Sequence, residues 1–177
     1  MSSSGGGGGL QSFNGRTAPA VVPTTGDYTA AEVGALPESG ASCRLYQTTA
    51  QGNLVSGSYT TVALDTLDYS VGTITHSLSA YSITIDVDGT YLVVGSVGVN
   101  SSLPTVVQMS IYVGATAVMD LSIPGGSSAG DVLRIVDLVR LVVGDVLTLG
   151  VFQLSGSTVG TAAGTSHTSL AATLVSL

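Results

Sequence analysis

The sequence predicts an all-β protein, built as a sandwich or a barrel of short strands. From residue 43 onward, apolar and polar residues alternate with the period of two that is typical of strands. Turn signals recur at short intervals, and the 177 residues include 24 glycines. No long amphipathic helical pattern is present, and the absence of a repeat of fixed period disfavours a propeller or a β-helix.

The alternation is clearest in the run 81–87, where Tyr, Ile, Ile and Val alternate with Ser, Thr and Asp. The Asp88-Gly89 pair that follows predicts a hairpin turn into a second run, 91–99. We expect another hairpin to turn at Gly114. The last run, 168–177, is expected to end the chain on a strand.

The most apolar stretch, residues 132–152, is long enough to resemble a membrane span. Four charged residues interrupt it, and each charge would be costly in lipid, so we expect no membrane insertion. The stretch instead predicts a pair of buried strands joined by a turn at Gly144-Asp145. The four charged residues are Arg134, Asp137, Arg140 and Asp145.

The composition favours association with other protein surfaces. Hydrophobic residues make up 44% of the chain, whereas charged residues make up only 8%, far below the roughly 25% of a typical soluble domain. A monomer with so few charges would be poorly solubilised. The chain has no lysine, and its four arginines face eleven acids, for a net charge of -7. This balance disfavours binding to nucleic acid and to anionic membranes.

Composition divides the chain into four segments. Residues 1–12 form a flexible Gly/Ser tether. Residues 13–36 form a short peptide with ordered features, and residues 37–42 form a second linker. Residues 43–177 form the β-domain.

The peptide 13–36 combines a turn, an extended segment and one short helix. Asn14-Gly15 is a turn signal, and the Pro-bounded "APAVVP" favours extended backbone. Thr29 and Glu32 form a capping box, and Gly34 ends the helix after about one turn. The apolar side chains of this peptide exceed what so short a segment can bury, which indicates a partner surface.

The stretch "SFNGRTAPAVVPTTGDYTAAEVGAL" resembles a short module of phage tail-fibre and minor tail proteins, with the pattern "FNGRTG-VVP-GDYTA-VGA". This chain departs from the module at Ala18-Pro19, where a glycine is usual. The resemblance implies that residues 13–36 dock the chain onto other tail or capsid proteins of a virion. The implied docking residues are Phe13, Asn14, Gly15, Arg16, Val21, Val22, Pro23, Gly26, Asp27, Tyr28 and Thr29.

Residues 43–177 resemble the trimeric jelly roll shared by tumour necrosis factor (TNF) and the globular heads of complement proteins. Three stretches carry the resemblance: "ITIDVDGTYLVVGSVGV", "LVRLVVGDVLTLGVF" and "SHTSLAATLVSL". The chain departs from the family in its few aromatic residues, with Leu170 where phenylalanine is common. The resemblance implies a jelly-roll β-sandwich with ten strands per subunit. It also implies a homotrimer whose three-fold axis is lined by apolar strand faces.

No residue pattern indicates catalysis, a metal or a cofactor. The "DVDG" stretch, Asp86 to Gly89, superficially matches a calcium loop but lacks the distal ligands, so the hairpin is preferred. His76 and His167 accompany no Gly-x-Ser-x-Gly elbow, and His167 is expected in a loop or facing the trimer axis. Cys43 is the only cysteine and is expected to be a buried apolar filler. The protein is therefore expected not to be an enzyme.

Recognition is expected in loops at one end of the sandwich, because rigid scaffolds commonly carry binding sites on their loops. Four tyrosines, Tyr46, Tyr59, Tyr69 and Tyr81, offer possible faces for saccharides, although core packing is the commoner role of an aromatic residue in a strand. The expected recognition residues are Asn100, Ser101, Ser102, Gly125, Gly126, Ser127 and Ser128.

Three functions remain open at this point. The favoured one is a tail or tail-tip fibre component of a virion, which is assembled in the bacterial cytoplasm and contacts a glycan or protein of the host surface. The second is a capsid decoration or head-fibre protein. The third is a depolymerase of host glycans, which would need paired carboxylates in a groove.

Overall fold

The computed structural model describes residues 12–13, 16–17, 40–100, 106–123 and 129–177. The chain divides into two compact units, 1–38 and 39–177. In the first unit, β1 (Ser12–Phe13) and β2 (Arg16–Thr17) pair antiparallel, with Phe13 opposite Arg16. The turn predicted at Asn14-Gly15 lies outside the described residues. The predicted helix lies outside the described residues, as do the other expected docking residues Asn14, Gly15, Val21, Val22, Pro23, Gly26, Asp27, Tyr28 and Thr29.

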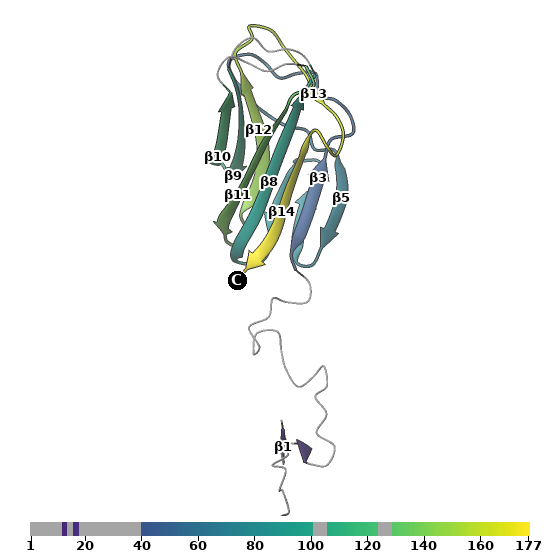
Figure 1. Ribbon diagram of the computed structural model, residues 1–177, viewed down its shortest axis with the longest axis vertical. Helices are drawn as coiled ribbons and strands as arrows, with labels where there is room; N and C mark the ends of the chain where they lie inside the picture. The colour runs from purple at the N-terminus through teal and green to yellow at the C-terminus, as the bar shows by residue number, and fades with distance from the viewer. Residues whose placement is uncertain (1–11, 14–15, 18–39, 101–105, 124–128) are drawn as a thin grey trace, which may run out of the picture. The chain divides into compact units, whose positions relative to one another are not determined.

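The second unit is a sandwich of two antiparallel sheets, which confirms the predicted all-β fold (Figure 1). Sheet I has the order β11-β8-β14-β3-β5, with β13 paired to β8. Its strands are β3 (Ser42–Tyr46), β5 (Thr66–Val71), β8 (Gly89–Val99), β11 (Val132–Leu141), β13 (Thr161–Ala162) and β14 (Ser169–Ser176). Sheet II has the order β10-β9-β12-β7-β6, with β4 paired to β12. Its strands are β4 (Tyr59–Thr61), β6 (Ile74–Ser77), β7 (Ser82–Ile85), β9 (Val107–Val113), β10 (Thr116–Ile123) and β12 (Val146–Gln153).

The described part of this unit therefore holds twelve strands, whereas the resemblance implies ten; β13 and β4 are the shortest. Its ordered structure begins before residue 43, because Ala41 is buried and its carbonyl accepts a hydrogen bond from the Leu174 N–H at 2.7 Å. Within the described residues, no helix has the length and apolar character needed to cross a bilayer.

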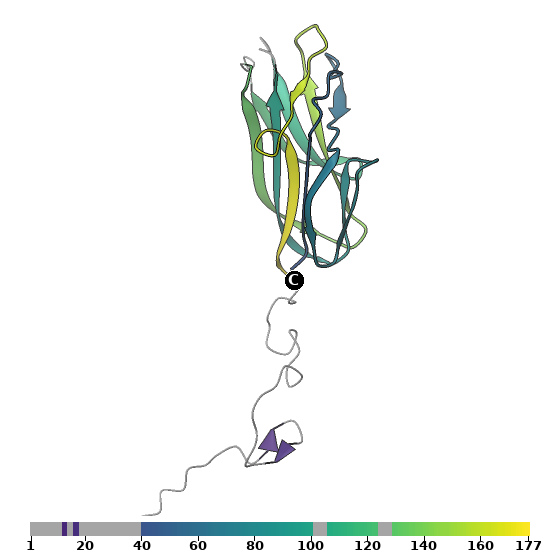
Figure 2. The same ribbon diagram turned by 90° about the vertical axis from the view of Figure 1, so that its right-hand side faces the viewer.

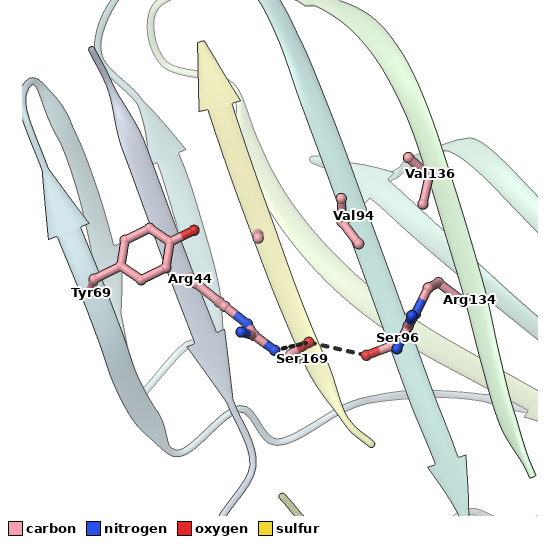
Figure 3. Close-up of a pocket in the computed structure, with 8 residues that line it drawn as sticks. Arg44, Tyr69, Val94, Ser96, Arg134, Val136 and Ser169 are labelled. Carbon is pink, nitrogen blue, oxygen red and sulfur yellow. Dashed lines mark hydrogen bonds between the residues drawn. The ribbon is translucent and has the colours of Figure 1, made fainter. Parts of the chain in front are cut away.

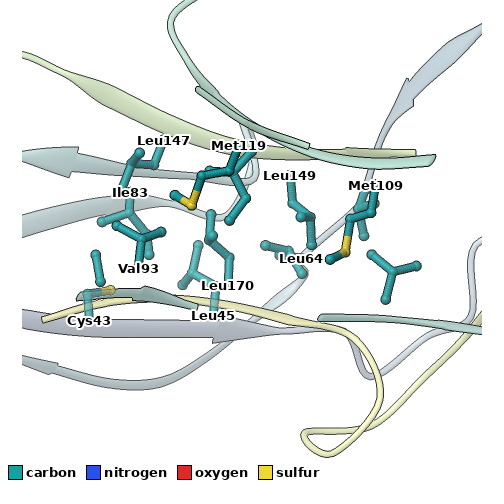
Figure 4. Packing of buried hydrophobic residues seen from close by; sticks show 14 of the residues in the cluster. Cys43, Leu45, Leu64, Ile83, Val93, Met109, Met119, Leu147, Leu149 and Leu170 are labelled. Carbon is teal, nitrogen blue, oxygen red and sulfur yellow. The ribbon is translucent and has the colours of Figure 1, made fainter. Parts of the chain in front are cut away.

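One apolar core lies between the sheets, as Figure 4 shows. The predicted alternation produces it: in β8, Tyr91 and Val93 are buried, whereas Leu92 between them faces outward. Cys43 is fully buried, as expected, and burial raises the pKa of its thiol to about 11, although a hydrogen bond with Ser70 opposes this. Leu170 is fully buried in this core. It stands where phenylalanine is common in the family that residues 43–177 resemble.

The hairpin predicted at Gly114 is confirmed, because β9 and β10 pair on either side of it. The hairpins predicted at Asp88-Gly89 and Gly144-Asp145 are wrong. The strands that flank each turn belong to different sheets: β7 and β12 lie in sheet II, whereas β8 and β11 lie in sheet I. Figure 2 shows the two layers that these connections join. Turn chemistry predicts where the chain reverses, but it does not decide which strands then pair.

The two crossovers are hydrogen-bonded to each other at one end of the sandwich. The Val143 N–H donates to Asp88 Oδ1 at 2.7 Å, and the Gly144 N–H donates to the Ile85 carbonyl at 2.8 Å. The Ile85 N–H in turn donates to the Asp145 carbonyl at 2.8 Å. The crossovers therefore join the ends of both sheets.

Gly89 is required by close packing rather than by a turn. A Cβ atom at this position would collide with Leu174 Cδ1 and would lie 2.6 Å from the Ser176 carbonyl oxygen. The leucine atom is the end of a flexible side chain, whereas the carbonyl belongs to the chain's backbone at the end of β14. The first residue of β8 must therefore be glycine if β14 is to run beside it.

We expect Gly89→Ala to lower the free energy of unfolding by about 1–3 kcal/mol, because the added methyl group overpacks the contact with β14. Denaturant unfolding followed by circular dichroism measures this change. Gly52→Ala is the matched control, since a Cβ at Gly52 meets nothing within 4 Å. Equal stability of the two variants would contradict the packing role of Gly89.

Asp65 ties the segment after β3 to the start of β5. Its carboxylate accepts hydrogen bonds from the Thr48 N–H at 2.7 Å, the Thr49 N–H at 3.0 Å, and the hydroxyls of Thr48 and Thr66 at 2.9 and 3.0 Å. Burial raises the pKa of Asp65, but these four hydrogen bonds together outweigh it and hold the pKa below its usual value.

A depressed pKa means that the Asp65 carboxylate stabilises the fold above the unfolded-state pKa of about 3.9, and that this contribution is lost as the pH falls through the folded-state pKa. We expect Asp65→Asn to be less stable than the natural protein at neutral pH, with a gap that narrows below about pH 4. Thermal unfolding over a pH series measures the gap. Asp68→Asn is the control, because among the residues that the structure describes its exposed carboxylate pairs with Arg44 alone, at 3.4 Å. A gap that is constant with pH would exclude this role for Asp65.

Candidate functional site

The outward face of sheet I carries two neighbouring rows of side chains that are mainly apolar. The strand register places them side by side from β11 across β8, β14 and β3 to β5. We call this surface the sheet I face. Its first row is Val136, Val94, Ala171, Arg44 and Tyr69, and its second row is Leu138, Leu92, Thr173, Ser42 and Val71.

The sheet I face exposes large apolar side chains. Val136 and Leu138 are each 57% exposed, and Leu92, Tyr69 and Val71 are also exposed. Single exposed apolar residues are ordinary on protein surfaces, but a contiguous group indicates an interaction site. The prediction that the stretch 132–152 forms two buried strands is therefore wrong for β11. The apolar residues of β11 divide between the core, which takes Leu133 and Leu141, and the outward face.

Polar groups border the apolar rows at one end of this face (Figure 3). The buried hydroxyls of Ser96 and Ser169 are hydrogen-bonded at 3.0 Å. The Arg44 guanidinium donates to Ser169 Oγ at 3.5 Å and to the Thr165 carbonyl, and it pairs with Asp68. Arg134 stands opposite Ser96 in the register, is exposed, and forms no ion pair with any residue that the structure describes.

A shallow hollow of about 390 Å³ lies over this border. Among the described residues, its lining contains two guanidinium groups, serine hydroxyls, a phenol and aliphatic side chains, but neither a carboxylate nor a histidine. Such a lining can bind, but it offers no general base for catalysis. The lining residues are Arg44, Tyr69, Val94, Ser96, Arg134, Val136, Ser169 and Ala171.

The structure bears on one of the expected recognition residues, Asn100. It is exposed directly after β8, and its N–H donates to the Gly160 carbonyl at 3.1 Å. The expected recognition residues fall in two segments, 100–102 and 125–128. Val99, which precedes the first segment, is hydrogen-bonded to residues that follow the second: its N–H donates to the Asp131 carbonyl at 3.0 Å, and its carbonyl accepts from the Gly130 N–H at 2.9 Å. The other expected recognition residues, Ser101, Ser102, Gly125, Gly126, Ser127 and Ser128, lie outside the described residues.

The remaining candidates do not gather into a catalytic or metal site. His167 lies in a loop before β14, as expected, with Nδ1 3.1 Å from Ser166 Oγ. His76 lies on β6, in the other sheet. Across the described ranges, no group of three or more His, Cys, Asp or Glu side chains could hold a metal ion. Of the four tyrosines, Tyr46 and Tyr81 are half-buried, whereas Tyr59 and Tyr69 are exposed on opposite sheets.

Comparison with known proteins confirms the jelly-roll fold. No family model and no curated protein matches the sequence. Solved structures do match: a crystal structure of murine APRIL aligns with a TM-score of 0.58 and 12% identity, over 77% of this chain and 99% of that chain. The structure of Eiger TNF from S. frugiperda aligns with a TM-score of 0.58 and 9% identity, over 78% of this chain and 94% of that chain. At these identities the likeness establishes a TNF-like sandwich and nothing further.

Proposed function

We propose that this chain is a non-enzymatic structural protein of a bacteriophage particle, a tail or tail-tip fibre component. Three copies associate through the sheet I face, and the peptide 13–36 docks the trimer onto the virion. The observation that carries the association is the exposed apolar sheet I face in a chain with only 8% charged residues. The virion role is supported by the resemblance of the N-terminal peptide to the phage tail module.

Association removes the sheet I face from water. Each Å² of apolar surface removed from water contributes about 25 cal/mol, and obligate interfaces commonly exceed ~2,000 Å². The part of the face on β11 and β8 carries Val136, Leu138 and Leu92, so a second copy can cover that part without burying a charge there. Arg134 lies at the border, where a carboxylate of a second copy can pair with it, and acids outnumber arginines by eleven to four.

The TNF-like fold supports a closed trimer rather than an open chain of copies. In the family of trimeric jelly rolls that residues 43–177 resemble, apolar strand faces line the three-fold axis. A closed ring satisfies every copy of the interface and leaves no end at which further copies can add.

The first unit supports docking. A pair of two-residue strands is too small to be stable alone in water, so β1 and β2 need a surface against which to pack. The module that the sequence "FNGRT…GDYTA" resembles occurs in phage tail proteins. This resemblance favours the tail over the capsid as the docking location.

We expect Leu138→Asp to convert a trimer into a monomer, because the new carboxylate would be buried without a partner in the interface. The fold of each copy should survive, since Leu138 is 57% exposed within it. Size-exclusion chromatography with light scattering at micromolar concentration measures the change. Val55→Asp is the matched control, since Val55 is 51% exposed and lies outside the sheet I face. A natural protein that is monomeric under these conditions would exclude the proposed assembly.

We expect deletion of residues 1–38 to leave the trimer intact but to abolish incorporation into phage particles. The deletion ends before Ala41 because that residue belongs to the core of the second unit. Immunoblotting of purified particles measures incorporation, and immunogold electron microscopy of the full chain locates it. Signal on the head rather than the tail would replace the fibre role by capsid decoration, and normal incorporation of the deleted chain would remove the docking role.

A further inference from the structure

Three aromatic side chains gather on the outward face of sheet II, away from the sheet I face. Tyr59 comes from β4, Tyr112 from β9 and Phe152 from β12. The Tyr59 ring meets Tyr112 edge-on at 86°, with 5.8 Å between centroids, and tilts 41° against Phe152 at 5.2 Å. We call these three residues the aromatic cluster. The topology assembles it, since β12 pairs with both β4 and β9.

A shallow hollow of about 230 Å³ opens beside the aromatic cluster. Its lining includes Tyr59, Tyr112, Thr60, Thr61 and Thr148, and the register places Tyr59 and Thr61 on one face of β4 and Thr60 on the other. Gly150 forms part of the lining, and a Cβ there would lie 2.9 Å from Tyr112 Cε2, so the absent side chain lets the ring lie against the strand. The volume is below the ~300–1,000 Å³ of pockets for drug-sized ligands, which favours a ligand of about one ring.

Tyr59 is rigid and yet accessible. Its ring contacts two others and sits on a strand in register with Phe152, but the residue remains 47% exposed. An aromatic ring held in this way presents a large amphipathic surface and loses little conformational entropy on binding. Its accessible surface therefore suits a ligand with both an apolar face and hydroxyl groups.

Ser110 is a buried polar residue on β9, two positions before Tyr112. It stands opposite Gly150 in the register, is fully buried, and its Oγ has no hydrogen-bond partner among the residues that the structure describes. Burial raises the pKa of the nearby Tyr112 phenol. The Ser110 hydroxyl lowers this pKa, although its Oγ forms no hydrogen bond of ordinary geometry with a described residue. Ser110 is buried and does not line the hollow, so the residues available to a ligand are those of the lining.

We propose that this hollow binds one neutral sugar ring of a glycan. The C–H face of a sugar packs on the Tyr59 ring, and its hydroxyls exchange hydrogen bonds with the Thr61 and Thr148 hydroxyls and the Tyr112 phenol. None of the described residues that line the hollow is charged. Asp120 stands opposite Ser110 on β10, and the chain carries a net charge of -7. These charges repel acidic sugars and favour neutral ones.

The assignment of the glycan to a host surface rests on the proposed function, whereas the site itself does not. Sheet II is the layer opposite the sheet I face, so association through the sheet I face leaves the hollow open. A trimer then presents three equivalent hollows. Three weak sites that engage one glycan-coated surface bind it more tightly together than any one of them alone. A millimolar affinity at each site is therefore sufficient for attachment of the trimer to such a surface.

The test uses the full chain and the methyl glycosides of glucose, galactose, mannose, rhamnose and N-acetylglucosamine, with the methyl glycoside of sialic acid as an acidic probe. Saturation-transfer NMR and titration measure binding. We expect at least one neutral glycoside to bind and the acidic probe not to bind. Tyr59→Ala should weaken binding at least about tenfold, whereas Tyr59→Phe, which keeps the ring, should stay within about threefold.

Thr75→Ala on β6 is the matched control, because it removes an exposed polar side chain from the same sheet away from the hollow and should leave binding unchanged. Absence of binding by every neutral glycoside at tens of millimolar would overturn the proposal, as would unchanged binding by Tyr59→Ala. Trimer mass and particle incorporation of Tyr59→Ala are measured in parallel. If Tyr59→Ala loses the trimer or is not incorporated into particles, the aromatic cluster serves assembly rather than sugar binding. If the natural chain is absent from particles, only the proposed virion role is removed.

Discussion

The packing of one sheet against the other over a single apolar core is the constraint on which the rest of this structure depends. Alternate residues of β8, β12 and β14 fill that core, and the residues between them must therefore face outward. The residues that fill the core thus determine which residues form the outer surface of each sheet. Sheet I carries aliphatic rows outward, and sheet II carries an aromatic cluster. One molecule therefore has two chemically different surfaces on its two layers.

The sequence predicted the layers better than their connections. Period-two alternation predicted the strands around Ile83, Tyr91 and Leu149 because it reports a local property, the side of the strand on which an apolar residue lies. The strand partners were predicted at Gly114 but not at Asp88-Gly89, because partner choice depends on contacts between distant segments. Gly89 illustrates the difference. In the sequence this glycine indicates a turn. In the structure a glycine is needed because a Cβ atom would collide with the carbonyl oxygen of Ser176, which lies almost ninety residues later in the chain.

The candidate surfaces were harder to predict than the fold. An apolar residue on a strand has the same sequence pattern whether it faces the core of its own subunit or the surface of another. The sequence therefore predicts two buried strands over 132–152, the stretch that contains Val136 and Leu138. The sequence did contain a signal for β11: Arg134 and Arg140 have the same parity as those two residues and must face outward with them. The aromatic cluster left no comparable signal. Tyr59, Tyr112 and Phe152 come from three strands, and only the pairing of β12 with both neighbours brings them together.

The environment of Cys43 has a practical consequence. The only thiol in the chain is fully buried, and its pKa of about 11 keeps it protonated at neutral pH. Thiolates, not thiols, react with electrophiles. A cysteine introduced on either outer layer would consequently be the sole target of maleimide dyes, and fluorescence could follow each layer of the sandwich separately without removal of the native residue.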